Sequence, residues 1–359
     1  MLREASPACG APVEPASRRC AAREQPRILL VKTSSLGDVV ANLPVVSDIL
    51  RWRPDAAIDW VVEEAFGDVV RLHRGVRKVI VVAQRRWRKQ PFSAASRAER
   101  RAFEARLREC RYDFVIDTQG LLKSAVIVRR ARGTAVGYGW ASAREPLAAL
   151  AFDRRIDVSR HLQATERNRR LAAGALGYPI RNPADFGLRR GAGAVGASGR
   201  RFWVALHGSS RAEKLWQESS WQALGQALAD RRLGAVLPWG NEAERERSER
   251  LRRGIPRAVV PPRLALTEVA GLLARASFVV GVDTGLTHLA AALGVPVVAL
   301  FSGSDPELSG VRGQGPFANL GGTIRAPDVR QVVAAIDGLL LRQAGGLERS
   351  SLPRAVGEE

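Results

Sequence analysis

Short apolar runs recur along this chain, each about as long as a buried strand and separated from the next by a helix-length segment. Parallel strands need such connecting segments, so the alternation predicts a parallel sheet that helices cover. The runs are 28–31, 58–62, 79–82 and 114–116, followed by 202–206, 235–237, 259–260, 278–282 and 297–301.

The alternation stops over 181–201, where Gly, Ala, Pro and Arg accumulate, and this interruption predicts an interdomain linker. We therefore expect an α/β protein with two doubly wound domains, 27–180 and 202–345, and a cleft between their facing strand ends. With 359 residues, 46% of them hydrophobic, the chain can bury two cores. The prolines and scattered charge of 1–26 predict a disordered extension. We expect 346–359 to be a flexible tail.

The chain carries a net charge of +20, which predicts attraction to a polyanion: nucleic acid, an anionic membrane surface or a phosphorylated substrate. Charge alone does not choose among these partners. No apolar run approaches the ~18 residues of a membrane span, and no secretory signal precedes the first strand. The three cysteines fit neither a disulfide framework nor a zinc site, which suits a reducing cytosol. Because no Asp-x-Asp pair and no histidine cluster occurs, we expect neither a metal nor a cofactor.

The loop after the first apolar run combines hydroxyls, a glycine and a carboxylate: Ser34, Ser35, Gly37 and Asp38. Open α/β proteins bind ligands at such strand ends. Asp38 is either a helix cap or a catalytic base. The helix expected after it has Val39, Leu43, Val46 and Leu50 on one face.

Two loops of the second half have the same strand-to-helix setting. The first contains Ser209, Ser210 and Lys214 and is either a diphosphate cradle or an ordinary exposed loop. The second begins at Asp283, which could cap a helix or hold a sugar hydroxyl, and the helix amino terminus that follows favours an anion. Its single Asp-Thr-Gly does not indicate an aspartic protease, which needs two carboxylates.

A basic segment follows the third apolar run. Its members Arg85, Arg86, Arg88 and Lys89 are either a solvated helix face, a nucleic-acid patch, or a surface that holds an acidic acceptor beside Asp38.

Seven motifs together resemble glycosyltransferase family 9, the lipopolysaccharide heptosyltransferases, and in particular the type that adds the first heptose. The similarity runs in order from Arg27 to Asp337. The motifs lie at 31–38 (VKTSSLGD), 59–64 (DWVVEE), 85–89 (RRWRK), 117–123 (DTQGLLK), 144–146 (REP), 237–240 (LPWG) and 282–288 (VDTGLTH). The chain departs from the family at Ser209 and Ser210, where threonine is common, and in its first 26 residues.

The resemblance implies a GT-B fold, in which two Rossmann-like domains face each other across a cleft. It also implies inverting transfer of L-glycero-D-manno-heptose from ADP-heptose to the Kdo of Kdo2-lipid A, at the cytoplasmic face of the inner membrane, by a peripheral enzyme whose domains close on the substrates.

By position, the family's general base falls on Asp38 and its phosphate-binding catalytic lysine on Lys214. The donor-binding positions are Ser209, Ser210, Lys214, Glu244, Leu264, Asp283, Thr284, Gly285 and His288. The acceptor-binding positions are Ser34, Ser35, Gly37, Arg85, Arg86, Arg88, Lys89 and Arg144.

Two other functions stay open from the sequence. An enzyme of the same family that adds the second heptose is the nearer one, although the Arg-Arg-Trp-Arg-Lys segment and the Thr-Ser-Ser loop favour the first-heptose type. A nucleic-acid-binding protein driven by its charge is not expected, because it would leave the polar strand-end loops unexplained.

Overall fold

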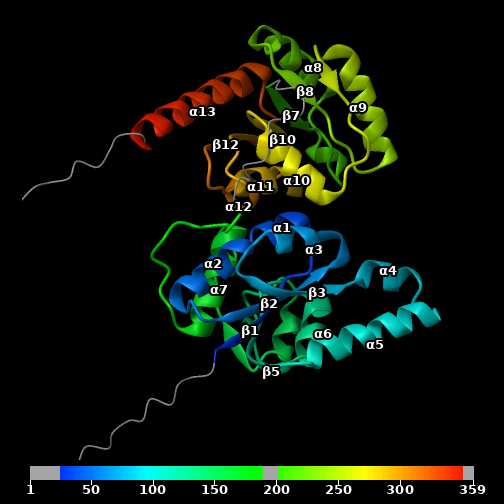
Figure 1. Cartoon of the computed structure of the whole chain (residues 1–359), viewed down its shortest axis with the longest axis vertical. Coiled ribbons are helices and arrows are strands. Elements are labelled where there is room, and N and C mark those ends of the chain that lie inside the picture. Colours follow the sequence, from blue (N-terminus) through cyan, green and yellow to red (C-terminus); the bar gives the residue numbers. More distant parts are fainter. Residues whose placement is uncertain (1–24, 189–200, 351–359) are drawn as a thin grey trace, which may run out of the picture.

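The computed structural model describes residues 25–188 and 201–350, with the side chains of 344–350 left out. Two α/β domains lie one above the other, and each is built on a six-stranded sheet (Figure 1). Every strand pair in both sheets is parallel. The prediction of two helix-covered parallel sheets is therefore confirmed.

The N-terminal domain has the strand order β3-β2-β1-β4-β5-β6. Its strands are β1 (Arg27–Val31), β2 (Ala57–Glu63), β3 (Val76–Val82), β4 (Arg111–Asp117), β5 (Arg132–Tyr138) and β6 (Arg154–Ile156). Its helices are α1 (Leu36–Val40), α2 (Leu43–Trp52), α3 (Gly67–Arg71), α4 (Gln84–Lys89), α5 (Ala94–Arg108), α6 (Leu122–Arg130) and α7 (Ala164–Leu176), with the 3₁₀ turns η1 (Glu64–Phe66) and η2 (Pro146–Ala151).

The C-terminal domain has the order β12-β11-β10-β7-β8-β9. Its strands are β7 (Phe202–Leu206), β8 (Gly234–Val236), β9 (Ala258–Val259), β10 (Val279–Val282), β11 (Val297–Ser302) and β12 (Phe317–Gly322). Its helices are α8 (Glu218–Ala227), α9 (Glu242–Gly254), α10 (Leu266–Arg275), α11 (Gly285–Ala292), α12 (Pro306–Ser309) and α13 (Val329–Ser350), with the 3₁₀ turns η3 (Ala212–Lys214) and η4 (Ala229–Arg231).

Both domains have the same topology once their strands are counted from the first of each domain. The order reads 3-2-1-4-5-6 in each sheet, which is the doubly wound Rossmann order. The strand order reverses between β1 and β4 in one domain and between β7 and β10 in the other. Ligands bind outside the carboxyl ends of the strands at such reversals, so the fold places a site at each of these two points.

Three strands were not predicted, and each lacks the β-branched run that marks the others. β5 carries Gly133 and Gly137, β6 is three residues long with two arginines, and β12 ends on two glycines. β6 and β12 lie at sheet edges, where fewer buried side chains are needed. These strands therefore have weak sequence signals although they pair regularly.

The single helix predicted after the first loop is wrong, because the structure has two. α1 ends at Val40, and α2 begins at Leu43 after a turn at Ala41 and Asn42. Pro44 occupies the first turn of α2, where its missing N–H is tolerated, whereas in the middle of one long helix it would break the hydrogen-bond ladder. Asp38 consequently lies in a helix of five residues.

The first part of the predicted linker is packed rather than loose. Phe186 and Leu188 are buried in a hydrophobic cluster. Asp185 accepts a hydrogen bond from Arg51 Nη2 at 2.6 Å and another from Gln314 Nε2 of the C-terminal domain at 2.6 Å. Residues 189–200, like 1–24 and 351–359, lie outside the described residues, and α13 extends past the predicted domain end at 345.

The two domains share apolar packing. One hydrophobic cluster contains residues of both sheets and of the helices between them, including Val39 of α1 and Leu289 of α11. Among the described residues, no helix is long and apolar enough to cross a membrane.

Candidate functional site

The domains meet through glycines at the start of α1 and of α11. A side-chain methyl added to Gly285 would lie 2.6 Å from Leu36 Cβ and 2.9 Å from the Gly37 backbone nitrogen. A methyl added to Gly37 would lie 3.3 Å from His288 Cδ2. The loop that follows β1 and the loop that follows β10 are therefore in direct contact, and Gly37, Gly285 and His288 come together as predicted for one site.

Asp38 is held at the head of α1 by the residue before the helix. Its Oδ2 accepts a hydrogen bond from the Ser35 backbone nitrogen at 2.9 Å and one from Ser35 Oγ at 3.0 Å. The carboxylate thus occupies the third helical position of a capping arrangement, with Ser35 as the cap residue. Oδ1 lies 3.8 Å from Arg144 Nη1, so one oxygen is held by Ser35 and the other faces Arg144.

The charges around Asp38 keep it ionised. Burial alone would raise the pKa of the Asp38 carboxyl, but Lys32, Arg144 and the hydrogen bonds from Ser35 outweigh burial and lower it below its usual value. Burial lowers the pKa of the Lys32 ammonium to about 8. Lys32 Nζ donates to the Thr118 carbonyl oxygen at 2.7 Å and lies 3.4 Å from Asn168 Oδ1. A buried cation therefore lies behind the loop that carries the carboxylate.

The backbone of this loop is fixed from the neighbouring strand β4. Gln119 Oε1 accepts hydrogen bonds from the backbone nitrogens of Thr33 at 3.0 Å and Ser34 at 3.2 Å. Asp117 in turn accepts from the backbone nitrogens of Gln119 at 2.7 Å and Gly120 at 3.1 Å. Burial raises the pKa of Asp117 to about 6. The loop position is thus set by a buried polar network at the sheet's switch point.

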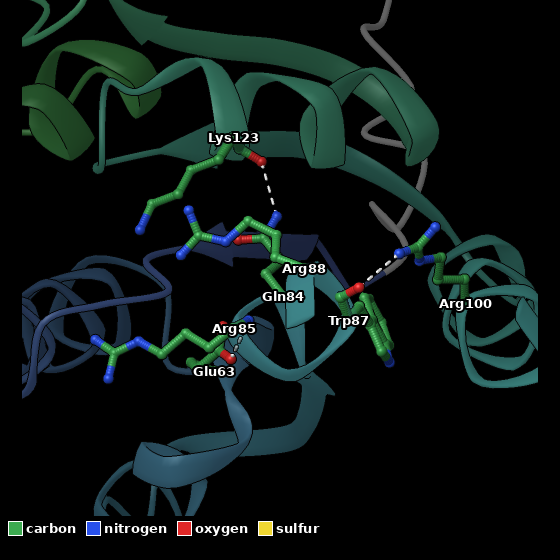
Figure 2. A pocket seen from close by; sticks show the side chains of 7 residues that line it. All are labelled: Glu63, Gln84, Arg85, Trp87, Arg88, Arg100 and Lys123. Atoms are coloured by element: carbon green, nitrogen blue, oxygen red, sulfur yellow. Dashed lines mark hydrogen bonds between the residues drawn. The ribbon is translucent and has the colours of Figure 1, made fainter. Parts of the chain in front are cut away.

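The basic segment forms α4 and lines a cavity of about 220 Å³ next to this loop (Figure 2). Figure 2 shows Arg85, Arg88 and Lys123 extending their charged ends to the same side. Lys123 Nζ donates to Ser34 Oγ at 2.7 Å, and the Lys123 carbonyl oxygen accepts from Gln84 Nε2 at 3.1 Å. Burial and the charges of Arg85 and Arg88 lower the pKa of Lys123. This cavity has the charge expected of an anion-binding surface.

Two members of the predicted acceptor set are placed differently. Arg86 pairs with Glu64 at 3.0 Å and with Glu99 at 2.8 Å, so its charge is already compensated. Lys89 is the exposed last residue of α4. Arg85 lies over the Phe66 ring at 5.3 Å, and its backbone nitrogen donates to Glu63 Oε1 at 3.0 Å. Arg85 and Arg88 therefore belong to the cavity, whereas Arg86 mainly braces α4.

In the C-terminal domain, Asp283 lies close to polar side chains of three segments: η3, α11 and the loop after β11. It pairs with Lys214 Nζ at 2.5 Å, accepts from Ser304 Oγ at 2.8 Å and lies 3.8 Å from His288 Nε2. Burial alone would raise the pKa of the Asp283 carboxyl, but His288, Lys214 and Ser304 hold it well below its usual value. A cation and an ionised carboxylate thus stand together at the end of β10, beside the amino terminus of α11.

The remaining residues predicted to bind the donor lie in the segments that follow β7, β8, β9 and β10. Glu244 accepts from the Gly240 nitrogen at 2.7 Å, and a methyl at Gly208 would lie 2.9 Å from its carboxyl carbon, so it is seated between the loops after β7 and β8. Thr284 is the cap residue of α11. Ser209 is half-buried, Ser210 is exposed, and Leu264 is half-buried before α10. Within the described residues no hydrogen bond joins Ser209 or Ser210 to Asp283, so their role stays a prediction.

Four residues of this constellation were not predicted as site residues: Lys32, Gln119, Lys123 and Ser304. Lys32 and Lys123 carried a usable signal, because they are two of only five lysines in an arginine-rich chain. Gln119 lies in the motif at 117–123 but was assigned no role, and Ser304 carried no signal, since its contact depends on loops that only the fold brings together. Within the described ranges, no group of three or more His, Cys, Asp or Glu side chains could hold a metal ion.

Comparisons with known proteins identify the family of this chain. Residues 100–328 match the model of glycosyltransferase family 9 (heptosyltransferase). Lipopolysaccharide heptosyltransferase 1 of Pseudomonas aeruginosa is 46% identical over 290 residues, which cover 80% of this chain and 82% of that protein.

Two solved structures of a heptosyltransferase are similar over most of both chains. Escherichia coli heptosyltransferase WaaC with ADP superimposes with a TM-score of 0.81 and 40% identity over 87% of this chain and 99% of that one. The same enzyme with ADP-2-deoxy-2-fluoro heptose gives a TM-score of 0.76 and 39% identity over 88% and 99%. The fold is accordingly GT-B, and this chain is a glycosyltransferase that belongs to glycosyltransferase family 9, the heptosyltransferases.

Proposed function

We propose that this enzyme transfers L-glycero-D-manno-heptose from ADP-heptose to the Kdo of Kdo2-lipid A, with inversion at the anomeric carbon. The observation that carries the proposal is the contact of two half-sites. Asp38 of one domain and the Lys214–Asp283 pair of the other flank the glycine contact between α1 and α11. A transfer between two bound substrates needs this two-sided arrangement, in which a base faces the donor.

Asp38 is the proposed general base. Inverting transfer needs one base, which removes the proton of the acceptor hydroxyl as its oxygen attacks the anomeric carbon opposite the leaving ADP. Ser35 binds one oxygen of the carboxylate and leaves the other directed to the acceptor side. Because its pKa is lowered, Asp38 is ionised at neutral pH, and the proton transfers as the hydroxyl becomes acidic in the oxocarbenium-like transition state.

Lys214 is the proposed partner of the leaving diphosphate. Negative charge grows on the phosphate as the sugar–oxygen bond breaks, and a cation aimed at that charge stabilises the transition state. Its pairing with Asp283 keeps the ammonium in place before the donor binds. Asp283 and His288 would contact the sugar and the diphosphate. Glu244, which lies between the loops after β7 and β8, would contact the nucleoside.

The acceptor is proposed to bind on the N-terminal domain. Kdo carries a carboxylate and lipid A carries phosphates, and the cavity lined by Arg85, Arg88 and Lys123 offers cations beside Ser34. Arg144, close to Asp38, adds another. Because this acceptor sits in a membrane, we further propose that the basic enzyme associates peripherally with the anionic cytoplasmic face of the inner membrane.

Purified enzyme should be assayed with ADP-heptose against two acceptors, Kdo2-lipid A and the same molecule already carrying one heptose. Heptose added only to the first supports the proposal, and heptose added only to the second identifies the second-heptose enzyme instead. Tight, salt-sensitive DNA binding without any sugar transfer would indicate the nucleic-acid-binding alternative.

A further inference from the structure

Large apolar side chains are exposed together on α6 and η2 of the N-terminal domain. Leu122 and Val126 on α6 are 46% and 50% exposed, and Leu147 and Leu150 on η2 are 60% and 66% exposed. Leucines that are more than half exposed are ordinary when they occur singly, whereas a group of them marks an interaction surface.

These four side chains belong to one surface, which we call the α6–η2 face. The Leu122 backbone nitrogen donates to Glu145 Oε2 at 2.6 Å, which joins the beginnings of the two elements. On their buried sides, Ala125 and Val128 of α6 and Ala148 of η2 enter the same hydrophobic cluster. The exposed residues recur at i and i+4 on α6 and at i and i+3 on the 3₁₀ turn, so each pair projects from one side of its element.

Basic side chains border this face. Lys123, Arg129 and Arg130 are on α6, and Arg144 precedes η2. Two of them have acidic partners, Arg129 with Asp153 at 3.4 Å and Arg130 with Glu104 at 2.9 Å, and Glu145 is the other exposed carboxylate on these elements. Arg85 and Arg88, which line the cavity beside Lys123, extend this basic border toward the site.

The face also adjoins the acceptor half of the site. Lys123, next to Leu122, donates to Ser34, and Arg144, three residues before Leu147, lies 3.8 Å from Asp38 Oδ1. An apolar surface bordered by cations suits an anionic bilayer in two ways. Its apolar side chains can enter the acyl region of the interface, and its cations can contact the anionic headgroups.

We propose that the α6–η2 face docks on an anionic lipid bilayer, with Leu122, Val126, Leu147 and Leu150 entering the interface and the neighbouring cations contacting lipid phosphates. This inference rests on the proposed function. If the acceptor is anchored in a membrane, a bilayer-binding surface beside Asp38 lets it reach the site without leaving the membrane.

The test uses the full chain and vesicles without any acceptor. Binding is measured by flotation with phosphatidylcholine vesicles that contain phosphatidylglycerol, and with phosphatidylcholine alone. The variant carries Leu122→Ser, Val126→Ser, Leu147→Ser and Leu150→Ser. The matched control, Ile324→Ser with Leu341→Ser, removes two strongly exposed apolar side chains of the other domain, 99% and 73% exposed.

We expect the wild type to bind the anionic vesicles and the fourfold variant to bind them at least about tenfold more weakly, a change of ~1.4 kcal/mol. The control should bind like the wild type, and salt should weaken binding in all three proteins. Equal binding by the fourfold variant and the wild type overturns the inference. A change of oligomeric state in light scattering, without a change in vesicle binding, also overturns it and makes a second copy of this chain the occupant.

Activity separates this inference from the proposed function. With the acceptor in vesicles, the fourfold variant should transfer heptose more slowly, and with a de-acylated, water-soluble acceptor it should match the wild type, with unchanged ADP affinity. Absence of transfer by the wild type in both assays contradicts the proposed function, while vesicle binding still reports on the face by itself.

Discussion

Asp38 takes part in the capping of α1, with Ser35 as the cap residue, and is free to act as the proposed base, because a carboxylate that receives two hydrogen bonds from Ser35 through one oxygen still has a second oxygen available. Asp283 likewise uses its two oxygens differently: Oδ2 pairs with Lys214, and Oδ1 lies close to His288. At this scale the residue types and their loops could be read from the chain. The partners could not, since Lys214 and Asp283 are 69 positions apart and meet only when β7 and β10 become neighbours.

Replacing Asp38 with asparagine keeps the size of the side chain and one acceptor for Ser35 but removes the base. Transfer should fall by roughly 10²- to 10⁴-fold, the usual contribution of general base catalysis, with ADP affinity nearly unchanged. Initial rates with ADP-heptose and calorimetric ADP titration check this. Asp55→Asn, an exposed carboxylate paired with Arg53, is the control. Transfer above about a tenth of the wild-type rate would refute the assignment.

The Lys214–Asp283 pair predicts opposite effects of its two members on ADP. Lys214→Met should weaken ADP binding roughly tenfold or more, since it removes a charge-assisted contact to the diphosphate. Asp283→Asn should keep or tighten ADP binding, because the lysine loses its internal competitor, while transfer from ADP-heptose falls. Calorimetry measures both affinities. Lys78→Met, which removes one member of an exposed pair with Glu109, should change neither ADP affinity nor transfer. Weaker ADP binding in both the Lys214 and the Asp283 variant would contradict the proposed opposition of their roles.

Among the elements, β1 has the most unusual ending, because the residue after it, Lys32, is a buried lysine. Its folded pKa of about 8 lies below the 10.5 of a lysine exposed to water, so the unfolded chain binds the proton more tightly. Below pH 8 the lysine is protonated in both states and burying its charge costs stability. Between pH 8 and 10.5 the folded state releases the proton first, which relieves this cost and makes stability rise with pH.

Lys32→Met therefore gives a pH-dependent prediction. The free energy of unfolding of the wild type, measured relative to this variant by denaturant titration, should increase by about 3 kcal/mol between pH 7.5 and 10.5. Other groups titrate in both proteins and cancel in the difference. A difference that stays flat, or falls, over this range would show that the Lys32 ammonium is not destabilised by burial.

Sequence periodicity identified the elements where β-branched residues dominate and failed where backbone geometry decides. The strands next to the switch points, β1, β4, β7 and β10, were predicted because they are buried on both faces. The edge strand β6 was missed because Arg154 and Arg155 are exposed there. The break between α1 and α2 was missed because the apolar spacing of Val39, Leu43 and Val46 continues across it, and only Pro44 marks it.

At the scale of the whole molecule, the two domains share apolar packing, and at the candidate site they meet at the backbones of Gly37 and Gly285. The sequence assigned Gly37 and Gly285 to opposite halves of one site, but no pattern in the chain predicted that their backbones would come this close. Their significance is steric and depends on the approach of two domains. The close approach of the two domains at this point therefore depends on the absence of side chains at Gly37 and Gly285 rather than on an attractive side chain.

Glycine replacements at the contact should act in a defined order. Gly285→Ala places a methyl 2.6 Å from Leu36 Cβ and should reduce transfer roughly ten- to a hundredfold, since a displacement near 1 Å has such effects. Gly37→Ala, with its nearest contact at 3.3 Å, should have a smaller effect. Gly271→Ala, which meets nothing within 4 Å, should have none. Initial rates, with thermal unfolding to confirm folding, check the series, and any other order contradicts a steric role.

A contact between two glycines also limits how this enzyme can vary. In an ordinary core, a larger side chain on one element can be compensated by a smaller one opposite, so substitutions at the two positions are correlated. Gly37 and Gly285 have no side-chain volume to give up, so neither can compensate for a change in the other. A library randomised at both positions and selected for heptose transfer should return glycine at each independently, without the correlated pairs that most packed contacts allow.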